Sequence, residues 1–191
     1  MTDNALKERL KVIADLVINP ENFDSMKLIS LSQNLAADLQ DGKRLAFIGN
    51  GGSAAESIHL AAEFTGRCVI DHRPLSVMSF AESQSALTAI SNDYGPEHVF
   101  SRQVEAHLRP GDYLIAMSTS GNSRNILKAI EVALELGVNV HLWTGSTKRS
   151  HKGAEIWNVQ SSSTPRIQEI HLMWGHLIAE LVELKIQDNS R

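Results

Sequence analysis

The sequence predicts an α/β fold: a single doubly wound parallel sheet with helices on both faces, preceded by an N-terminal helical extension. Short apolar segments alternate with longer segments of helical periodicity along the chain. The clearest unit is YLIAMS at 113–118, a helical pattern that stops at Gly137, and VNVHLW at 138–143. Two apolar strands joined by a helix form a parallel pair. Because no linker, low-complexity segment or repeat divides the 191 residues, we expect one domain over residues 1–191.

The chain begins with two predicted helices. Apolar residues recur at helical spacing over residues 4–18, and Pro20 breaks that pattern. The spacing resumes over residues 24–40 and ends at Asp41 and Gly42, where a turn is expected.

The first strand leads into a glycine-rich turn. The segment LAFIGNGGSAAESIHLAAEFTGR, at 45–67, predicts a strand, a loop containing three glycines, and a helix from Ser53. Glycine permits positive φ and brings backbone N–H groups close to a ligand. Ser53 and Glu56 have the spacing of a capping box, so we expect them to fix the helix start. The loop would therefore hold an anion at the positive end of the helix dipole.

The rest of the chain continues the alternation. We expect a strand at 75–80, a helix near 82–91, a turn at 92–96 and a helix at 97–108, which Pro110 and Gly111 end. The last strand is predicted at 154–159, and a polar loop follows it at 160–164. The final helix runs over 165–186, with Pro165 in its first turn, where the missing N–H costs least.

Composition excludes several classes of protein. The net charge is −4 and no Lys/Arg-rich block occurs, which disfavours a nucleic-acid partner. Cys68 is the single cysteine, so no intrachain disulfide can form and a reducing compartment is expected. The N-terminus lacks the apolar core of a signal peptide, and no apolar run reaches the roughly 18 residues of a membrane span. We expect a soluble cytoplasmic protein without a membrane partner.

A second loop gathers hydroxyl groups between a strand and a helix. Ser118, Thr119, Ser120 and Ser123 surround Gly121 in the sequence STSGNS. A phosphate there would meet hydroxyl donors, backbone N–H groups and a helix N-terminus together. The structural alternative is an ST-turn with an N-cap, which needs only one or two hydroxyls. Because the loop lacks the lysine of a Walker motif and the GxGxxG spacing, a sugar phosphate is favoured over a nucleotide.

His59 and Glu63 lie four residues apart on the helix after the glycine loop, so they share one face. They are a general acid/base pair, two ligands of a divalent metal, or an ordinary surface pair. Their position one to two turns after the loop favours a functional role. Partial burial of Glu63 among alanine and leucine would raise its pKa toward the range useful for proton abstraction.

The last helix is unusually polar for a packing element, since it carries Arg166, Gln168, Glu169, His171 and His176. Either histidine could also be a core residue with a hydrogen-bond partner. Gln168 and His176 lie about 12 Å apart along a helix. One ligand reaches both only if the side chains lean together or come from different subunits, which favours a site completed by oligomerisation.

Four segments together resemble the sugar isomerase (SIS) domain of bacterial phosphoheptose isomerases: GNGGSAAESIHLAAEFTGR, SNDYG, STSGNS and RIQEIHLMWGH. STSGNS alone is typical of the broad superfamily, and the combination is far more specific. The resemblance implies conversion of sedoheptulose 7-phosphate to D-glycero-D-manno-heptose 7-phosphate, which supplies heptose for lipopolysaccharide or other surface glycans. It also implies cytoplasmic homotetramers, with residues 1–42 used in oligomerisation, sites that draw on neighbouring subunits, and often zinc.

The resemblance also implies residue roles. Glu63 would be the base that moves a proton between C1 and C2 through a cis-enediol, and His176 its acid/base partner. Zinc, one per subunit, would take His59, Glu63, Gln168 and His176. The positions that match substrate contacts are Asn50, Gly51, Gly52, Ser53, Arg67, Asn92, Asp93, Ser118, Thr119, Ser120, Ser123 and Gln168.

One departure concerns the substrate. Many phosphoheptose isomerases have an acidic residue directly before the R-I-Q-E motif, where this chain has Pro165. An isomerase of another long-chain sugar phosphate is therefore an alternative. A second alternative is a non-catalytic SIS-domain protein, such as those that bind the replication initiator or sense a sugar phosphate. The initiator-binding proteins lack the Glu and the terminal His, whereas this chain has Glu63 and His176.

Overall fold

The strands form one parallel sheet in the order β2-β1-β3-β4-β5. The computed structural model describes residues 2–146 and 151–189, so the other residues of the predicted 1–191 domain lie outside the description. This strand order confirms the predicted doubly wound sheet. The strands are β1 (Leu45–Gly49), β2 (Val77–Ser79), β3 (Tyr113–Ser118), β4 (Asn139–Thr144) and β5 (Glu155–Asn158).

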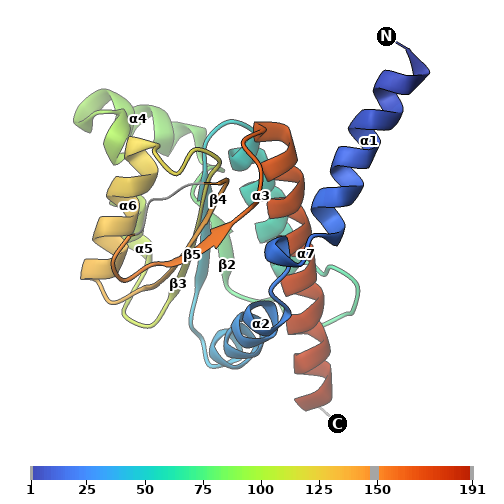
Figure 1. The fold of residues 1–191 in the computed structure, drawn as a ribbon. Helices are drawn as coiled ribbons and strands as arrows, with labels where there is room; N and C mark the ends of the chain where they lie inside the picture. The colour runs from blue at the N-terminus through green and yellow to red at the C-terminus, as the bar shows by residue number, and fades with distance from the viewer. Residues whose placement is uncertain (1, 147–150, 190–191) are drawn as a thin grey trace.

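Helices cover both faces of the sheet (Figure 1). One layer contains α2 (Ser25–Gln40), α3 (Gly52–Thr65) and α7 (Thr164–Asn189). The other contains α4 (Gln84–Tyr94), α5 (Ser101–His107) and α6 (Arg124–Glu135). The remaining helical segments are α1 (Asp3–Ile18) and the 3-10 turns η1 (Pro20–Asn22) and η2 (Pro96–His98).

The sheet separates two apolar cores. Along β1, Leu45 and Phe47 pack toward α3 and α7, whereas Ala46 and Ile48 pack toward α5 and α6. Side chains alternate in this way because successive residues of a strand point to opposite faces. All five residues of β1 are buried, as expected for a parallel strand covered on both sides.

The strands β1 and β3 are neighbours, with Gly49 opposite Met117 at their carboxyl ends. The helix that follows β1 packs on one face and the helix that follows β3 packs on the other. The chain therefore opens a crevice between the loops that leave these two strands, and ligands of doubly wound sheets bind in such a crevice. Both loops that the sequence singles out lie there.

Three local predictions differ from the structure. The helix α3 has Gly51 as its N-cap and no side-chain cap, so Ser53 and Glu56 do not form a capping box. The predicted turn at 92–96 begins later, because α4 continues to Tyr94 and includes Asn92 and Asp93. Gly95, with φ +97°, ends α4, and the predicted helix at 97–108 is divided into η2 and α5.

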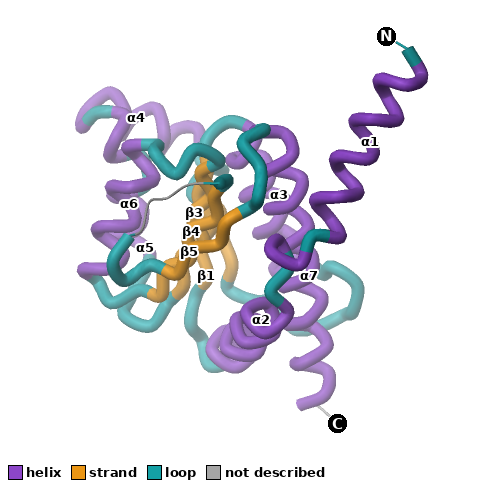
Figure 2. The backbone as a smooth tube through the Cα atoms, in the orientation of Figure 1, coloured by secondary structure: helices purple, strands orange, loops and turns teal. Residues whose placement is uncertain are grey.

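The N-terminal helix α1 leads away from the rest of the fold (Figures 1 and 2). None of its described residues is buried. Leu6, Leu10 and Val12 are each more than half exposed. At the end of α1, Leu16 and Val17 pack against the core, whereas the exposed apolar side chains of its earlier turns form an uncovered apolar side. Among the described helices, none has the length and apolar character that a membrane span requires.

Candidate active site

The loop after β1 needs glycine at two positions, one for its backbone conformation and one for lack of space. Gly51 has φ +56°, a conformation that side chains disfavour. A Cβ on Gly52 would lie 2.3 Å from the Nε2 of Gln168 on α7. The loop is thus pressed against the start of α7, and Asn50, Gly51 and Gly52 are exposed at the carboxyl end of the sheet.

The serine-rich loop after β3 is arranged around Gly121, which has φ +65°. The Ser118 hydroxyl donates to the Ser123 hydroxyl at 3.2 Å. The Asn122 N–H donates to the Ser120 Oγ at 3.2 Å, which is an ST-turn. Ser123 is the N-cap residue of α6, yet its side chain makes no cap hydrogen bond. Of the predicted structural roles, the ST-turn is therefore made by Ser120, whereas the Ser123 hydroxyl does not cap the helix.

The two loops are joined by a pair of side-chain amides. The Asn50 Nδ2 donates to the Asn125 Oδ1 at 2.9 Å, and the Asn125 Nδ2 donates to the Asn50 Oδ1 at 2.8 Å. These reciprocal bonds fix the glycine loop beside the first turn of α6. Asn125 is absent from the predicted site. Its position two residues after the serine loop is the only signal in the sequence that could have identified it.

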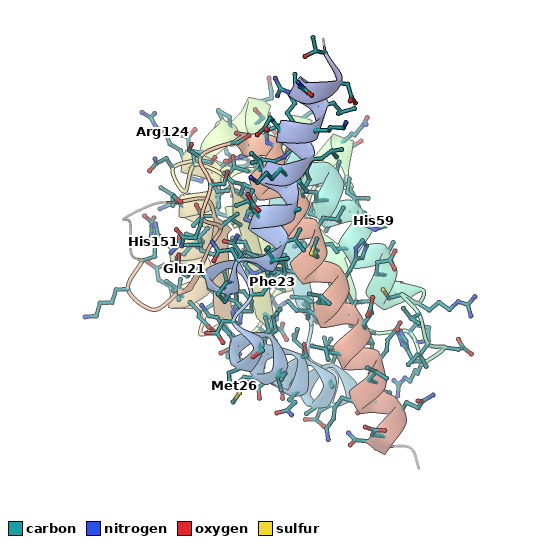
Figure 3. The ribbon with its side chains drawn as sticks, turned by 45° about the vertical axis from the view of Figure 1, so that its right-hand side comes forward. Glu21, Phe23, Met26, His59, Arg124 and His151 are labelled. Carbon is teal, nitrogen blue, oxygen red and sulfur yellow. The ribbon has the colours of Figure 1, made fainter. Side chains whose placement is uncertain are left out.

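Three predicted residues of the reacting centre lie together. The Nε2 atoms of His59 and His176 are 2.8 Å apart, with the rings nearly perpendicular at 89°. The His59 Nε2 is 3.6 Å from a Glu63 carboxylate oxygen. His59 points outward from α3 (Figure 3) and its side chain is 48% exposed, whereas that of Glu63 is 20% exposed. At 2.8 Å one histidine nitrogen donates a hydrogen bond and the other accepts it, according to the tautomers present.

The close packing of α3 and α7 produces this cluster. A Cβ on Gly175 would lie 2.3 Å from a methyl carbon of Leu60, which is fully buried. Glycine at position 175 therefore allows the two helices to approach. This approach brings the adjacent His176 beside His59, which adjoins Leu60.

Gln168 lies at the other end of the same helix contact. Its Nε2 donates to the Ser53 Oγ at 3.5 Å, near the glycine loop. Among the contacts of the described residues, none connects Gln168 to the cluster of His59, Glu63 and His176. The predicted separation of Gln168 and His176 is thus retained in the structure, with one near each end of the candidate site.

The donor chemistry of the cluster fits a divalent metal. Two imidazole nitrogens and one carboxylate oxygen lie within 4.8 Å of one another. Zinc takes such ligands in sites that keep a position open for water or substrate. Three of the four predicted metal ligands are therefore assembled, and the fourth, Gln168, contacts Ser53 instead.

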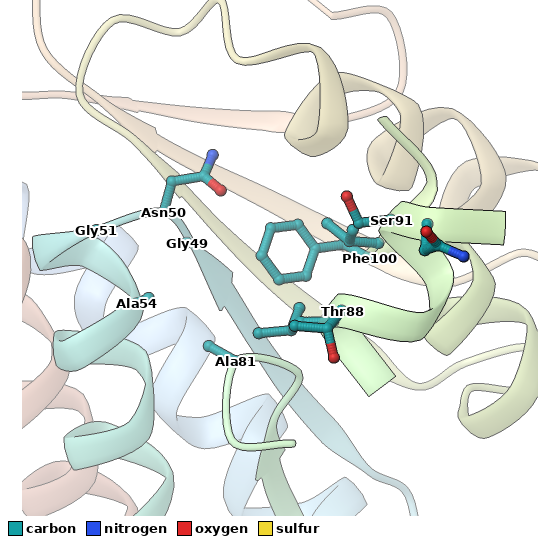
Figure 4. A pocket seen from close by; sticks show the side chains of 11 residues that line it. Gly49, Asn50, Gly51, Ala54, Ala81, Thr88, Ser91 and Phe100 are labelled. Atoms are coloured by element: carbon teal, nitrogen blue, oxygen red, sulfur yellow. The ribbon is translucent and has the colours of Figure 1, made fainter. Parts of the chain in front are cut away.

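A cavity of about 560 Å³ lies between the glycine loop and α4 (Figure 4). It brings the predicted substrate residues Asn50 and Gly51 together with Asn92. Ala54 of α3 also lines it. Ala54 precedes His59 by five residues, about 140° around a helix, so the cavity and the histidine cluster lie on different sides of α3.

The remaining predicted residues line neither the cavity nor the histidine cluster. Arg67 is exposed just after the end of α3. Asp93 is exposed and accepts a hydrogen bond from the Asn92 amide at 2.8 Å. On α7, Arg166 and Glu169 pair with each other.

His171 belongs to the core. Its ring is fully buried and lies 6.0 Å from Trp143 and 5.4 Å from Trp174, measured between ring centroids. Burial lowers the pKa of His171 to about 3, with the Thr144 backbone acting in the opposite direction. The ring is therefore neutral at physiological pH, and of the two histidines on α7 only His176 reaches the candidate site.

Glu56 has an environment that the sequence did not indicate. It lies on the same side of α3 as His59 and Glu63, at helical spacing. Burial raises the pKa of Glu56 to about 7, against the opposing effect of the Ser53 hydroxyl. The capping role predicted for Glu56 gave no reason to expect a carboxyl group with a raised pKa on this side of α3.

Comparisons with known proteins agree with this fold. The family profile described as SIS domain matches residues 10–145. A phosphoheptose isomerase from Rhodospirillum rubrum is 51% identical over 153 residues, which cover 78% of this chain and 80% of the relative. The similarity to this phosphoheptose isomerase therefore extends over most of both chains.

Two solved structures have the same architecture. A phosphoheptose isomerase from Neisseria gonorrhoeae has 32% identity and a TM-score of 0.85, covering 95% of this chain and 98% of its own. A phosphoheptose isomerase from Francisella tularensis has a TM-score of 0.88 with 24% identity, covering 96% and 100% of the two chains. At that identity the second likeness concerns the fold alone.

Proposed function

The chain belongs to the phosphoheptose isomerase family of SIS-domain enzymes, and we propose that it converts sedoheptulose 7-phosphate to D-glycero-D-manno-heptose 7-phosphate. The observation that carries this proposal is the cluster of His59, Glu63 and His176, whose candidate ligand atoms all lie within 4.8 Å of one another. An aldose–ketose isomerisation needs one base, one acid and a fixed handle on the substrate, and it needs no redox cofactor.

The serine-rich loop supplies the handle. The first turn of α6 offers backbone N–H groups and the positive end of a helix dipole, although the Ile126 N–H already donates to the Asn125 Oδ1. Ser118, Thr119, Ser120 and Ser123 add hydroxyl groups at the same place, and the hydroxyl of Ser123 is not used for capping. Binding of the phosphate there would hold the sugar chain in a defined orientation toward α3 and α7.

Glu63 and His176 supply the proton transfers. Glu63 takes the proton from C1 of the ketose while His176 gives a proton to O2, which forms the cis-enediol. Glu63 then returns its proton to C2, and the proton of O1 passes back to His176 as the C1 aldehyde forms. Both residues end in their starting states, so one pair of groups completes the cycle.

A bound zinc ion would be held by His59, Glu63 and His176, with Gln168 as the fourth candidate. When bound, it would polarise the carbonyl and hydroxyl oxygens of the substrate as a Lewis acid. In this structure His59 orients His176 through their 2.8 Å contact, and both imidazoles would be ligands of the ion when it is bound.

We further propose a homotetramer with residues 1–42 in its interfaces. Leu6, Leu10 and Val12 of α1 expose their apolar side chains. The cavity with Asn50 and Asn92 lies on a different side of α3 from the histidine cluster, so a neighbouring subunit would complete each site. The proposed location is the cytoplasm, where the product would supply heptose for lipopolysaccharide or another surface glycan.

A related long-chain sugar phosphate is the second candidate substrate. Pro165 stands in the exposed first turn of α7, where it offers no carboxylate to a sugar hydroxyl. A purely binding role is disfavoured because both Glu63 and His176 are present and adjacent to His59.

The test is direct turnover. Purified protein is incubated with sedoheptulose 7-phosphate, with and without added zinc, and the products are separated and identified. The proposal expects the aldoheptose 7-phosphate to form. Formation of an aldose only from a different sugar phosphate would move the assignment to that substrate, and the absence of any turnover would favour a binding role.

A further inference from the structure

A second cavity, of about 300 Å³, lies at the amino ends of the strands. Three residues that line it, Tyr113, Asn139 and Glu155, are the first residues of β3, β4 and β5. The glycine loop and the serine-rich loop lie instead at the carboxyl ends of β1 and β3. The other described residues that line the cavity are His141 of β4 and Lys27, Ser30, Leu31 and Asn34 of α2. The cavity is therefore separate from the candidate active site.

His141 is the buried polar group of this cavity, with a side chain that is 8% exposed. Its Nδ1 accepts a hydrogen bond from the Trp157 Nε1 at 3.3 Å and lies 3.3 Å from a Glu155 carboxylate oxygen. An indole N–H can only donate. Trp157 is 4% exposed and depends on this acceptor, whereas the Glu155 side chain is 46% exposed and can bind water. Nδ1 is therefore assigned as the acceptor, which places the ring proton on Nε2.

The Nε2–H of His141 is a donor that faces the cavity. Protonation of the ring would add a proton to Nδ1 and keep the one on Nε2, so the donor is present in both charge states. Among the hydrogen bonds of the described residues, none uses this nitrogen, and it is not one of their fully enclosed unpaired atoms. Because a polar group in so buried a ring needs a partner, the occupant of the cavity must supply an acceptor there.

The charges of the cavity disfavour a phosphate. Lys27 is the only lysine or arginine among the described residues that line it. Its Nζ donates to the Ile156 carbonyl oxygen at 2.6 Å and lies 3.3 Å from a Glu155 carboxylate oxygen. The ammonium group is thus already paired, and the Glu155 carboxylate would repel an anion. A neutral occupant is therefore favoured.

The remaining groups suit a molecule with several hydroxyls. Ser30 and Asn34 are exposed on α2, and their side chains can both donate and accept hydrogen bonds. The Glu155 carboxylate can accept from a ligand hydroxyl, and buried Leu31 adds an apolar wall. The volume equals that of about ten water molecules at roughly 30 Å³ each, which is enough for a molecule of the size of a hexitol.

We infer that this cavity is a second binding site, which takes a neutral sugar or polyol without a phosphate group. The His141 Nε2–H donates to an oxygen of the ligand, Glu155 accepts one of its hydroxyls, and Ser30 and Asn34 bind it at the rim. Binding there requires no residue of the candidate active site.

The test uses D-glucitol, which has hydroxyl groups but neither a carbonyl to isomerise nor a phosphate. It is titrated into the intact protein labelled with nitrogen-15, and the signals of the Trp157 indole and the His141 ring are followed by NMR. Both signals should shift in a saturable way, because the Trp157 N–H is bonded to the ring that binds the ligand. Inorganic phosphate should leave both signals unchanged.

Variants locate the binding. Asn34→Ala, at the exposed rim, should weaken D-glucitol binding about 10-fold, as expected for the loss of one hydrogen bond. Gln33→Ala is the matched control, since Gln33 is a neighbouring exposed amide that does not line the cavity. Ser123→Ala, in the serine-rich loop, should also leave the affinity unchanged. His141→Leu should abolish binding and His141→Gln, which keeps an N–H donor, should restore part of it, with folding checked by circular dichroism.

Three results would overturn the site. Trp157 and His141 signals that do not respond to D-glucitol would mean that the cavity holds water alone. A loss of affinity in Gln33→Ala or Ser123→Ala as large as in Asn34→Ala would place the binding elsewhere. Phosphate that shifts the same signals at lower concentration than D-glucitol would contradict a neutral ligand. Turnover of sedoheptulose 7-phosphate tests the proposed function independently of all three.

Discussion

His171 and His176 lie five residues apart on α7 and have opposite environments. His171 is enclosed by Trp143 and Trp174, whereas His176 contacts His59 at the surface of the α3–α7 contact. Spacing along the helix identified both as candidates without separating them, because the difference depends on which side of α7 faces the sheet, and only the family resemblance singled out His176. A residue's chemistry is therefore set here by a packing contact between distant segments.

The burial of His171 predicts a pH-dependent stability. Its folded pKa is about 3 against an ordinary 6.5. The unfolded chain binds a proton below pH 6.5 and the folded protein does not, so stability is lost as the pH falls from 6.5 toward 3. At pH 5 this amounts to about 2 kcal/mol. His171→Leu should lack this component, so thermal unfolding at pH 8 and pH 5 should differ less in the variant. An equal loss in both proteins would contradict the neutral buried ring.

At the level of elements, the sequence predicted the alternation of strands and helices and placed both loops at the carboxyl end of the sheet. Periodicity and glycine positions are local signals, so they sufficed for β1, β3 and α6. The pairing of Asn50 with Asn125 and of Gln168 with Ser53 was not predictable in this way. These contacts join segments separated by 75 and 115 residues, and only the three-dimensional packing brings them together.

Ser123 tests whether the serine-rich loop is a phosphate site or a structural cap. Its hydroxyl makes no cap bond, so Ser123→Ala should change the unfolding free energy by much less than the roughly 1 kcal/mol typical of a lost cap. The same variant should raise KM for sedoheptulose 7-phosphate. Urea unfolding and steady-state kinetics measure the two quantities. A loss of stability with unchanged KM would favour the cap.

Gly175 tests the helix contact that assembles the cluster. Gly175→Ala should force Leu60 aside and cost about 1–3 kcal/mol from overpacking, partly offset by the better helix propensity of alanine. It should also lower kcat, because His176 moves away from His59. Adding Leu60→Ala makes room for the new methyl group and should restore part of kcat. If Gly175→Ala kept full activity, the close approach of α3 and α7 would not be needed for the site.

At the scale of the whole molecule, the strand order places the two loops in one crevice, and the packing of α3 on α7 assembles the histidine cluster. The cavity near Asn92 lies on another side of α3, and α1 extends away from the domain (Figure 1). The chain thus presents residues of the proposed site on two surfaces, together with exposed apolar side chains on α1. Both features fit an assembly in which neighbouring subunits complete each other.

In the proposed assembly, the apolar side of α1 forms part of the interfaces between subunits. Leu10→Asp places a charge where Leu10 is 55% exposed and should shift the protein from a tetramer to smaller species. Light scattering coupled to gel filtration measures the mass. The control is Lys11→Asp, which changes an exposed, already charged position on the same helix. An unchanged mass for Leu10→Asp would remove α1 from the proposed interface.

The central claim is that Glu63 moves a proton between C1 and C2 of a sugar phosphate. The most direct measurement is proton NMR of sedoheptulose 7-phosphate incubated in D₂O with the wild-type protein and with Glu63→Gln. The wild-type protein should form the aldose with deuterium at C2, because a proton held by the Glu63 carboxylate exchanges with solvent, and Glu63→Gln should form no product. Turnover by Glu63→Gln, or wild-type product that never carries deuterium at C2, would contradict the account.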